Sequence, residues 1–412
     1  MNEPNSNSNS PFTKAALLLV STLTVMSGAT IAPSLPAMQD YFVNVANVEL
    51  LVKLVITMPA LFIVIGSPIA GMIVDRFGRK PLLLITTLFY GLTGASGLIL
   101  NSLPAILVGR AFLGLSVSGV MVGATTLIAD YYIGAARTTF MGLQAAFMSL
   151  GGVLFLSLGG TLALHNWRYP FLIYLFSLLL LPLIVFAIYE PQRNLPEKIF
   201  ASNKGRHDAS IPVSLLLLIF GITTLSQIIF YLIPVQLPFY LRSLVNATPS
   251  QSGIAIAFCT LFSAFTSMIY GRIKAKLDFV SIVPFTFGIF GIGYVIIGHA
   301  NTYPAALVGL AIAGLGLGLL MPNMSVWVST IVPDAVRGRA LGGLSTAFFL
   351  GQFLSPIITQ PVSQKVGLAL TYSLAGGLLL LLTAMFSMMR SQVTALSVKP
   401  TRVNNTTHDL EG

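Results

Sequence analysis

The chain has 412 residues, of which 55% are hydrophobic and only 8% charged, and its mean hydropathy is +0.87. This composition excludes a soluble globular protein, because a soluble surface of that size needs far more charge. Apolar runs of about 20 residues, long enough for a helix to cross the hydrocarbon core of a bilayer, recur along nearly the whole chain. The sequence therefore predicts an all-α membrane protein surrounded by lipid.

Twelve apolar segments follow one another in two sets of six. The first set covers 14–36, 48–72, 82–100, 104–129, 139–164 and 168–189, and the second covers 212–241, 250–273, 280–299, 304–331, 339–362 and 367–390. We expect two six-helix bundles with a polar linker between them and a disordered polar tail at each end. The expected ranges are 1–13 for the first tail, 14–189 for the first bundle, 190–211 for the linker, 212–390 for the second bundle and 391–412 for the second tail.

Lysine and arginine residues predict the orientation, since they concentrate in the cytoplasmic loops of membrane proteins. If both tails are cytoplasmic, only four of the 22 basic residues fall on the outer side: Lys53, Arg168, Arg242 and Lys365. The net charge of +10 then reports topology rather than a nucleic-acid partner. We expect a multi-pass membrane protein with both termini in the cytoplasm.

The two halves repeat at an offset of 200 residues. The segment 301–309 reads Asn-Thr-Tyr-Pro-Ala-Ala-Leu-Val-Gly, and 101–109 reads Asn-Ser-Leu-Pro-Ala-Ile-Leu-Val-Gly. The same offset aligns Arg137 with Arg337 and Gly151 with Gly351. A general apolar bias does not align Asn, Pro, Arg and Gly at one spacing. Each copy holds six spans, so both have the same direction in the membrane, as in transporters built from parallel repeats.

The segment 71–81, which we call the motif loop, places four charges and two glycines between the second and third spans. Its residues of interest are Gly71, Asp75, Arg76, Gly78, Arg79 and Lys80. So much charge in so short a connection predicts a tight turn that docks against another part of the protein. The equivalent segment of the second half, 271–280, keeps a glycine and positive charges but lacks the acid at the matching position.

The chain resembles the major facilitator superfamily over essentially its whole length, through the motif loop and through Arg110 in the fourth span. In pattern it is closest to bacterial twelve-span drug/proton antiporters, which implies a place in the bacterial inner membrane. Those members usually carry a Gly-Pro pair in the fifth span, where this chain has Phe155-Leu156 between Gly151 and Gly159-Gly160. The resemblance implies two bundles that alternate access to a central cavity.

The resemblance also implies that Asp75 faces the start of the eleventh span, near Arg337. A carboxylate there is favourable because a helix N-terminus carries a partial positive charge and unpaired N–H groups. Arg79 is expected to pair with Asp130 at the inner end of the fourth span. Together with Arg137, these residues predict a latch on the cytoplasmic side. The alternative is a simple turn that anchors topology.

Arg110 lies about two turns inside the fourth span, where an unpaired cation would cost at least ~2.5 kcal/mol. It either lines the cavity, as an anion contact or as a neighbour of a proton site on Asp40 or Glu49, or forms structural hydrogen bonds to carbonyls of the first span. Lys53 follows Glu49 by four residues, so the two share a helix face and can neutralise each other.

Polar and aromatic side chains inside other spans are candidates for substrate contact, each with helix–helix packing as the alternative. They are Gln144, Gln227, Tyr231, Gln236, Asn323, Trp327 and Gln352. The histidines show no metal-ligand spacing and no phosphate-binding loop is present, so we expect no metal, no cofactor and no enzymatic activity.

The sequence thus predicts a secondary active transporter for a small-molecule substrate, acting as a monomer. Our first expectation is proton-coupled efflux of small, partly apolar organic compounds. The alternative is a transporter of an organic anion or metabolite, with Arg110 as the anion contact. A non-transporting membrane sensor is a more distant alternative, since the linker and tails are too short for a soluble sensing domain.

Overall fold

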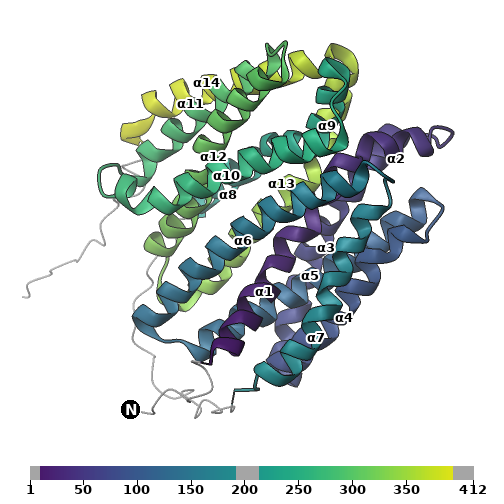
Figure 1. Ribbon diagram of the computed structural model, residues 1–412. Helices are drawn as coiled ribbons and strands as arrows, with labels where there is room; N and C mark the ends of the chain where they lie inside the picture. Colours follow the sequence, from purple (N-terminus) through teal and green to yellow (C-terminus); the bar gives the residue numbers. More distant parts are fainter. Residues whose placement is uncertain (1–9, 192–212, 393–412) are drawn as a thin grey trace, which may run out of the picture.

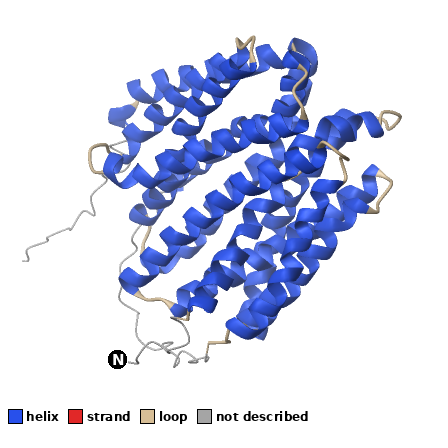
Figure 2. Cartoon of the chain, viewed as in Figure 1, coloured by secondary structure: helices blue, strands red, loops and turns tan. Residues whose placement is uncertain are grey.

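The computed structural model describes residues 10–191 and 213–392, and within these ranges nearly every residue lies in a helix and none in a strand. Figure 2 shows the helices joined by short loops. The first half comprises α1 (Pro11–Ala29), η2 (Ala32–Ser34), α2 (Leu35–Tyr41), α3 (Val48–Phe77), α4 (Arg79–Ala95), η3 (Ser96–Leu98), α5 (Leu103–Tyr131), α6 (Gly134–Ala163), η4 (Tyr169–Leu175) and α7 (Phe176–Ala187). The second half comprises α8 (Val213–Phe230), α9 (Leu232–Val245), α10 (Pro249–Lys274), α11 (Phe279–Gly298), α12 (Tyr303–Ile331), α13 (Asp334–Val366) and α14 (Leu368–Met388).

These elements form twelve helical segments long and apolar enough to cross a membrane, which confirms the predicted number of spans. The first span is interrupted, since it consists of α1, η2 and α2, and the seventh consists of α8 and α9. The first span also begins at Pro11, inside the stretch predicted as a tail, because proline is well suited to the first turn of a helix. Most of the predicted tails and linker lies outside the described residues.

The sequence repeat is also a packing repeat. Gly114 of α5 lies so close to α3 that a Cβ on it would be 2.4 Å from the Pro59 carbonyl oxygen. Gly314 of α12 has the same relation to α10, where a Cβ would be 2.3 Å from the Cys259 carbonyl oxygen. Both the glycines and their contacts are 200 residues apart. Small residues let the same pair of spans approach closely in each half.

A pair of buried tyrosines holds the first span of each half. In the first half the hydroxyls of Tyr90 and Tyr174 donate to carbonyl oxygens of α1, at 2.7 and 3.1 Å. In the second half Tyr294 donates to the last turn of α8 at 2.7 Å, and Tyr372 donates to the first residue of α9 at 2.8 Å. The two halves therefore share a polar core of the same design as well as the same helix order.

The two halves meet more closely at one end than at the other. We call the end where α1 begins and α14 ends the terminal end, and the other the opposite end. Figure 1 shows α6 and α10 near each other beside α2 and α9, at the opposite end, and diverging toward the terminal end. At the opposite end a Cβ on Gly160 of α6 would lie 2.9 Å from the Pro249 carbonyl oxygen at the start of α10. The opposite end is thus closed by direct backbone contact.

Candidate functional site

The motif loop spans the end of α3 and the start of α4, and only one of its residues lies outside a helix. Gly78 alone separates the two helices, with a φ of +102° and a ψ of 169° that only glycine adopts readily. A Cβ at this position would also lie 2.7 Å from a carboxylate oxygen of Glu190. The glycine is required on both counts, by its backbone conformation and by the group that docks on it.

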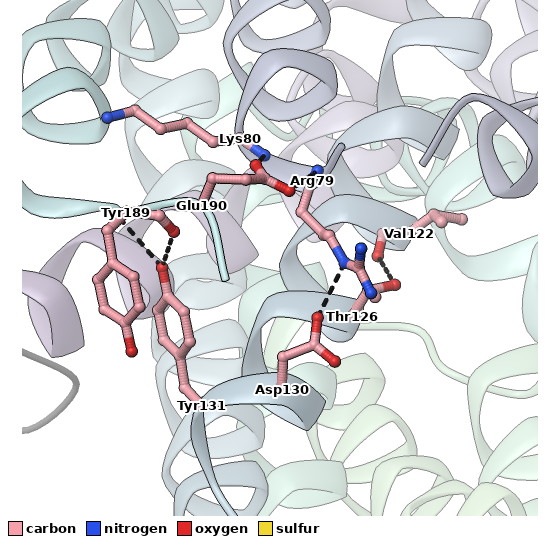
Figure 3. A network of polar contacts seen from close by, with 8 residues as sticks. All are labelled: Arg79, Lys80, Val122, Thr126, Asp130, Tyr131, Tyr189 and Glu190. Carbon is pink, nitrogen blue, oxygen red and sulfur yellow. Dashed lines mark hydrogen bonds and ion pairs between the residues drawn. The ribbon is translucent and has the colours of Figure 1, made fainter. Parts of the chain in front are cut away.

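Glu190, just after α7, caps the N-terminus of α4. Its two carboxylate oxygens accept the backbone N–H groups of Arg79 and Lys80 at 2.8 and 2.7 Å (Figure 3). Free N–H groups and the partial positive charge of a helix start attract such a carboxylate. Glu190 was not predicted as a functional residue. The only signal for it was an acid directly after the sixth span, at the start of the predicted linker.

The side chains of the motif loop brace the first half. Arg79 Nε forms an ion pair with Asp130 of α5 at 2.9 Å, which is the pairing expected from the sequence. Lys80 Nζ donates to the Val185 carbonyl of α7 at 2.8 Å. Both partners belong to the same half as the motif loop. These contacts therefore fix α3, α4, α5 and α7 to one another and do not by themselves join the two halves.

Tyr131 and Tyr189 complete this cluster. Their rings stack with centroids 4.4 Å apart, and the Tyr131 hydroxyl donates to the Tyr189 carbonyl and accepts its N–H (Figure 3). This contact holds the residue before Glu190 against the end of α5. Neither tyrosine was predicted, because their pairing depends on how the sixth span returns to the fourth.

The other residues of the proposed latch lie at the same end of the molecule. Asp75 is exposed on the last turns of α3, and Arg76 beside it packs over the ring of Phe77 at 5.4 Å. Arg137 is exposed in the first turn of α6, and Arg337 at the start of α13 donates from Nε to a carbonyl at the end of α12. Gly71 lies within α3, with open space where its Cβ would be. The contact between Asp75 and the start of α13 stays a prediction.

The second half caps its third span differently. Asp278 accepts the N–H of Ser281 at 2.8 Å as a local cap of α11, and Arg390 approaches its other oxygen at 3.3 Å. Partial burial raises the pKa of Asp278, but the hydrogen bonds from Ser281 and the nearby Arg390 outweigh it and hold the pKa below its usual value. Each half thus caps the N-terminus of its third span with a carboxylate. In the first half this is Glu190, from a distant segment, and in the second half it is Asp278, from the turn itself.

Arg110 is enclosed in the core of the first half rather than open to a cavity in this conformation. Its side chain is 1% exposed, and the guanidinium carbon lies 4.6 Å from the ring of Phe171 and 4.7 Å from that of Tyr174. Among the described residues, neither terminal nitrogen has a hydrogen-bond partner. The residue at the equivalent position of the second half is Leu310, so only one half carries this buried charge.

The predicted substrate contacts fall into two groups. Gln144 donates to Ser21 of α1 at 2.9 Å, and Gln352 approaches Gln227 at 3.5 Å, both between helices of a single half. Tyr231 lies across the interface between the halves, with its hydroxyl 3.0 Å from where a Cβ on Gly28 would be.

Asn323 and Trp327, by contrast, are buried inside the second half near its terminal end. Asn323 donates to the Phe279 carbonyl at 3.0 Å, and Trp327 stacks on the Phe279 ring. Their contacts in this conformation are those of packing residues. A role for either in substrate binding stays a prediction.

At the opposite end, polar side chains join the two halves. Asp40 of α2 forms an exposed ion pair with Arg242 of α9 at 2.7 Å. Glu49 of α3 accepts hydrogen bonds from Gln360 and Gln364 of α13 at 2.7 and 2.9 Å. Both acids were predicted as possible proton sites, whereas their partners were not predicted.

Lys53 and Gln236 extend this network inward. Lys53 Nζ and Gln236 Nε2 both donate to the Gln360 side-chain oxygen, the second at 3.2 Å. All three side chains are at most 4% exposed. Gln236, a predicted substrate contact, thus takes part in closing the opposite end. A pocket of about 350 Å³, lined by Glu49 and Gln360 among others, adjoins the network.

Comparisons with known proteins agree with this architecture. The model of the Major Facilitator Superfamily matches residues 17–244 and 218–408. The chain is 27% identical over 305 residues to Multidrug resistance protein 1 of Bacillus subtilis (strain 168), covering 71% of this chain and 76% of the relative. It is 21% identical over 338 residues to the quinolone resistance protein NorA of Staphylococcus aureus (strain COL), covering 78% and 84%.

A solved D-xylose-proton symporter superposes with a TM-score of 0.75 at 16% identity, over 90% of this chain and 96% of that one. The fold is therefore shared with a transporter of a sugar, and the fold alone does not select a substrate. Twelve spans in two repeated halves, the motif loop and the family match lead to one conclusion: the chain is a multi-pass membrane transporter that belongs to the Major Facilitator Superfamily.

Proposed function

We propose that this transporter exports small, partly apolar organic compounds by alternating access, with protons as the coupling ion. The observation that carries the proposal is the asymmetry between the two ends, which are closed beside α2 and α9 and divergent at the terminal end. That arrangement is what one state of a rocking two-bundle transporter requires. The drug-resistance names of two relatives support the cargo class.

The distribution of basic residues supports a cytoplasmic location for the terminal end. The described conformation is then inward-facing, with the outer side closed. On this orientation the motif loop lies in the cytoplasm, and so do both termini. We assign the protein to the bacterial plasma membrane, because its relatives in sequence are bacterial.

We propose a partly apolar cargo because four of the candidate substrate contacts between helices carry no charge. Gln144, Gln227, Gln352 and Tyr231 supply amides and a hydroxyl, in a chain of which 55% of the residues are hydrophobic. A mostly apolar lining with a few hydrogen-bonding points suits a ligand with much apolar surface. Such a site tolerates variation in the cargo better than one built on an ion pair.

The motif loop acts in this cycle as the inner latch. When the terminal end closes, Asp75 meets the start of α13, where helix N–H groups and Arg337 attract its carboxylate. The cluster of Arg79, Asp130 and Glu190 keeps α3 and α4 rigid, so that Asp75 arrives in the right place. The latch favours the state in which the outer side is open.

Asp40 and Glu49 are the proposed proton sites. Each carboxylate contacts the other half at the outer side, Asp40 through Arg242 and Glu49 through two glutamines. Protonation removes the charge that these donors stabilise, so proton uptake at either site changes the contact between the halves.

Proteoliposomes with an imposed pH gradient test the proposal. We expect a lipophilic cation to move in the direction opposite to the flow of protons. We expect this transport to stop when an ionophore dissipates the pH gradient. The matched controls are protein-free liposomes and Asp75→Asn. Transport that is indifferent to the gradient would remove proton coupling, and transport of organic anions alone would remove the cargo class.

One observation favours the alternative cargo, an organic anion. The terminal nitrogens of Arg110 have no hydrogen-bond partner among the described residues, so the guanidinium still has donors to offer. It must first be uncovered from the rings of Phe171 and Tyr174. Anion transport that is lost in Arg110→Lys, which keeps the charge but not the planar fork, is the result that this alternative requires.

A further inference from the structure

Gln360 of α13 connects two opposite charges that lie on a single helix of the other half. Glu49 and Lys53 are one turn apart on α3, where such residues normally pair directly. Here the Gln360 side-chain nitrogen donates to Glu49 at 2.7 Å, while the Gln360 side-chain oxygen accepts from Lys53. One carboxamide thus satisfies the anion with its donor and the cation with its acceptor.

The part of the network that contains the Lys53 ammonium is buried. Lys53 and Gln360 are each 4% exposed, and the Lys53 ammonium lies 4.8 Å from the ring centroid of Phe239 on α9. Gln236 of α9 donates to the same Gln360 oxygen and orients the amide. A buried ammonium without such partners is costly. The partners that make burial of Lys53 acceptable, apart from Glu49, therefore come from the second half.

Separation of the halves at this end removes all of these second-half contacts at once. Lys53 then keeps only Glu49, four residues earlier on its own helix, and the two charges can pair directly in the water that enters. The Glu49–Lys53 pair is therefore satisfied in both states, by Gln360 when the end is closed and by itself when the end is open. If only one of the two positions carried a charge, that charge would lack its partner of opposite sign when the end is open.

We infer that Gln360 is a positioning residue of the transport cycle, which holds the opposite end shut by separating the Glu49–Lys53 pair and binding both members. The inference rests on the alternating movement proposed above. Glutamine suits this role because its side chain carries a donor and an acceptor. A carboxylate would repel Glu49, and an apolar side chain would leave both charges to pair with each other and release α13.

The test measures opening directly, without a substrate. Leu50 lines the pocket beside the network, so Leu50→Cys reports access when a membrane-impermeant maleimide is applied at the opposite end. The native Cys259 is 2% exposed and gives the background. We expect Gln360→Ala to raise the labelling rate about tenfold, which corresponds to about 1.4 kcal/mol in the ratio of open to closed molecules.

Gln364→Ala is the matched control. Gln364 lies one turn further along the same helix and donates to the same Glu49 oxygen, but it is exposed. We expect its replacement to change labelling by less than about threefold, as for most exposed polar contacts. If Gln360→Ala labels no faster than Gln364→Ala, the inference is wrong.

A rescue separates positioning from a general loss of folding. The exchange K53Q/Q360K moves the ammonium to α13, where it meets Glu49, and leaves an amide on α3. We expect the exchange to return labelling to within about threefold of the parent. For Gln360→Ala we also expect a lower maximal transport rate with KM changed less than about twofold, since Gln360 closes an end rather than binding cargo.

These readouts keep the two proposals apart. Labelling that follows the expected order in protein that transports none of the tested compounds would support Gln360 and remove the proposed cargo. Proton-driven export, together with a labelling rate that Gln360→Ala does not change, would support the proposed function and remove the role of Gln360. An exchange variant that elutes as a monodisperse peak and still labels as fast as Gln360→Ala would overturn the positioning role.

Discussion

Replacement of Gly78 by alanine tests the motif loop most sharply, because two separate costs coincide there. The backbone at φ +102° and ψ 169° lies in a region that is almost exclusive to glycine, and a residue with a Cβ pays about 1–3 kcal/mol to remain in it. The new Cβ also enters the space of the Glu190 carboxylate, 2.7 Å away.

The second cost depends on how Glu190 responds. Its carboxylate is the flexible end of an exposed side chain, so it can move aside, but then it gives up the N–H groups of Arg79 and Lys80. Two such hydrogen bonds contribute about 0.5–1.5 kcal/mol each. The sum for Gly78→Ala is roughly 2–6 kcal/mol of local destabilisation, enough to loosen the junction of α3 and α4.

The assay compares initial transport rates in proteoliposomes with the apparent melting temperature of the purified protein. Gly71→Ala is the matched control, because Gly71 belongs to the same motif but its Cβ would meet open space within α3. Alanine there should be neutral or stabilising by up to about 1 kcal/mol. We expect Gly78→Ala to lower both the rate and the melting temperature, and Gly71→Ala to lower neither.

The double variant G78A/E190A separates the two costs. In a protein that already lacks the Glu190 carboxylate and its two hydrogen bonds, Gly78→Ala adds only the backbone strain, so the two single effects should overlap rather than add. Fully additive effects, or a Gly71→Ala variant as impaired as Gly78→Ala, would refute the reasoning.

Three further predictions concern other parts of the cycle. Asp75→Asn should insert normally but transport at least about tenfold more slowly, since the neutral side chain loses the attraction of a helix start; wild-type turnover would leave the motif loop as a topology anchor. Arg110→Leu, which copies the second half, should preserve the melting temperature within a few degrees and abolish transport, and retained transport with equal expression would show the charge to be dispensable. Gly160→Ala should hold α6 away from the Pro249 carbonyl and make the opposite end reactive to impermeant thiol reagents in a suitable cysteine variant, with Gly377→Ala, whose Cβ would meet open space, as the unaffected comparison.

Local patterns were sufficient to predict the helices and their repetition. Runs of apolar residues define spans because a membrane requires them, and Gly114 and Gly314 align because close packing of the same spans recurs. The Arg79–Asp130 pair was also predictable, since both residues lie at the same ends of spans that a two-bundle fold places together. In each case the residues that form the pattern are themselves the residues that cross the membrane or make the contact.

The network around Gln360 was not predictable in the same way. Glu49 and Gln360 are 311 residues apart, and nothing local distinguishes Gln360 from the other glutamines of the spans. Its role depends on the angle at which α13 crosses α3, which many small packing choices determine together. Glu190 was missed for a similar reason, because its function depends on where the sixth span ends relative to Gly78.

The tyrosine pairs have a consequence for how a helix bends within lipid. Pro234 has no N–H, so the Phe230 carbonyl at the junction of α8 and α9 lacks its usual helical donor. The Tyr294 hydroxyl, which bonds the Ile229 carbonyl, lies 3.4 Å from that orphaned oxygen. Water is excluded from this site, so the Tyr294 hydroxyl takes the place of a water molecule as the hydrogen-bond donor. The seventh span can therefore flex at this junction without exposing a bare peptide group to hydrocarbon.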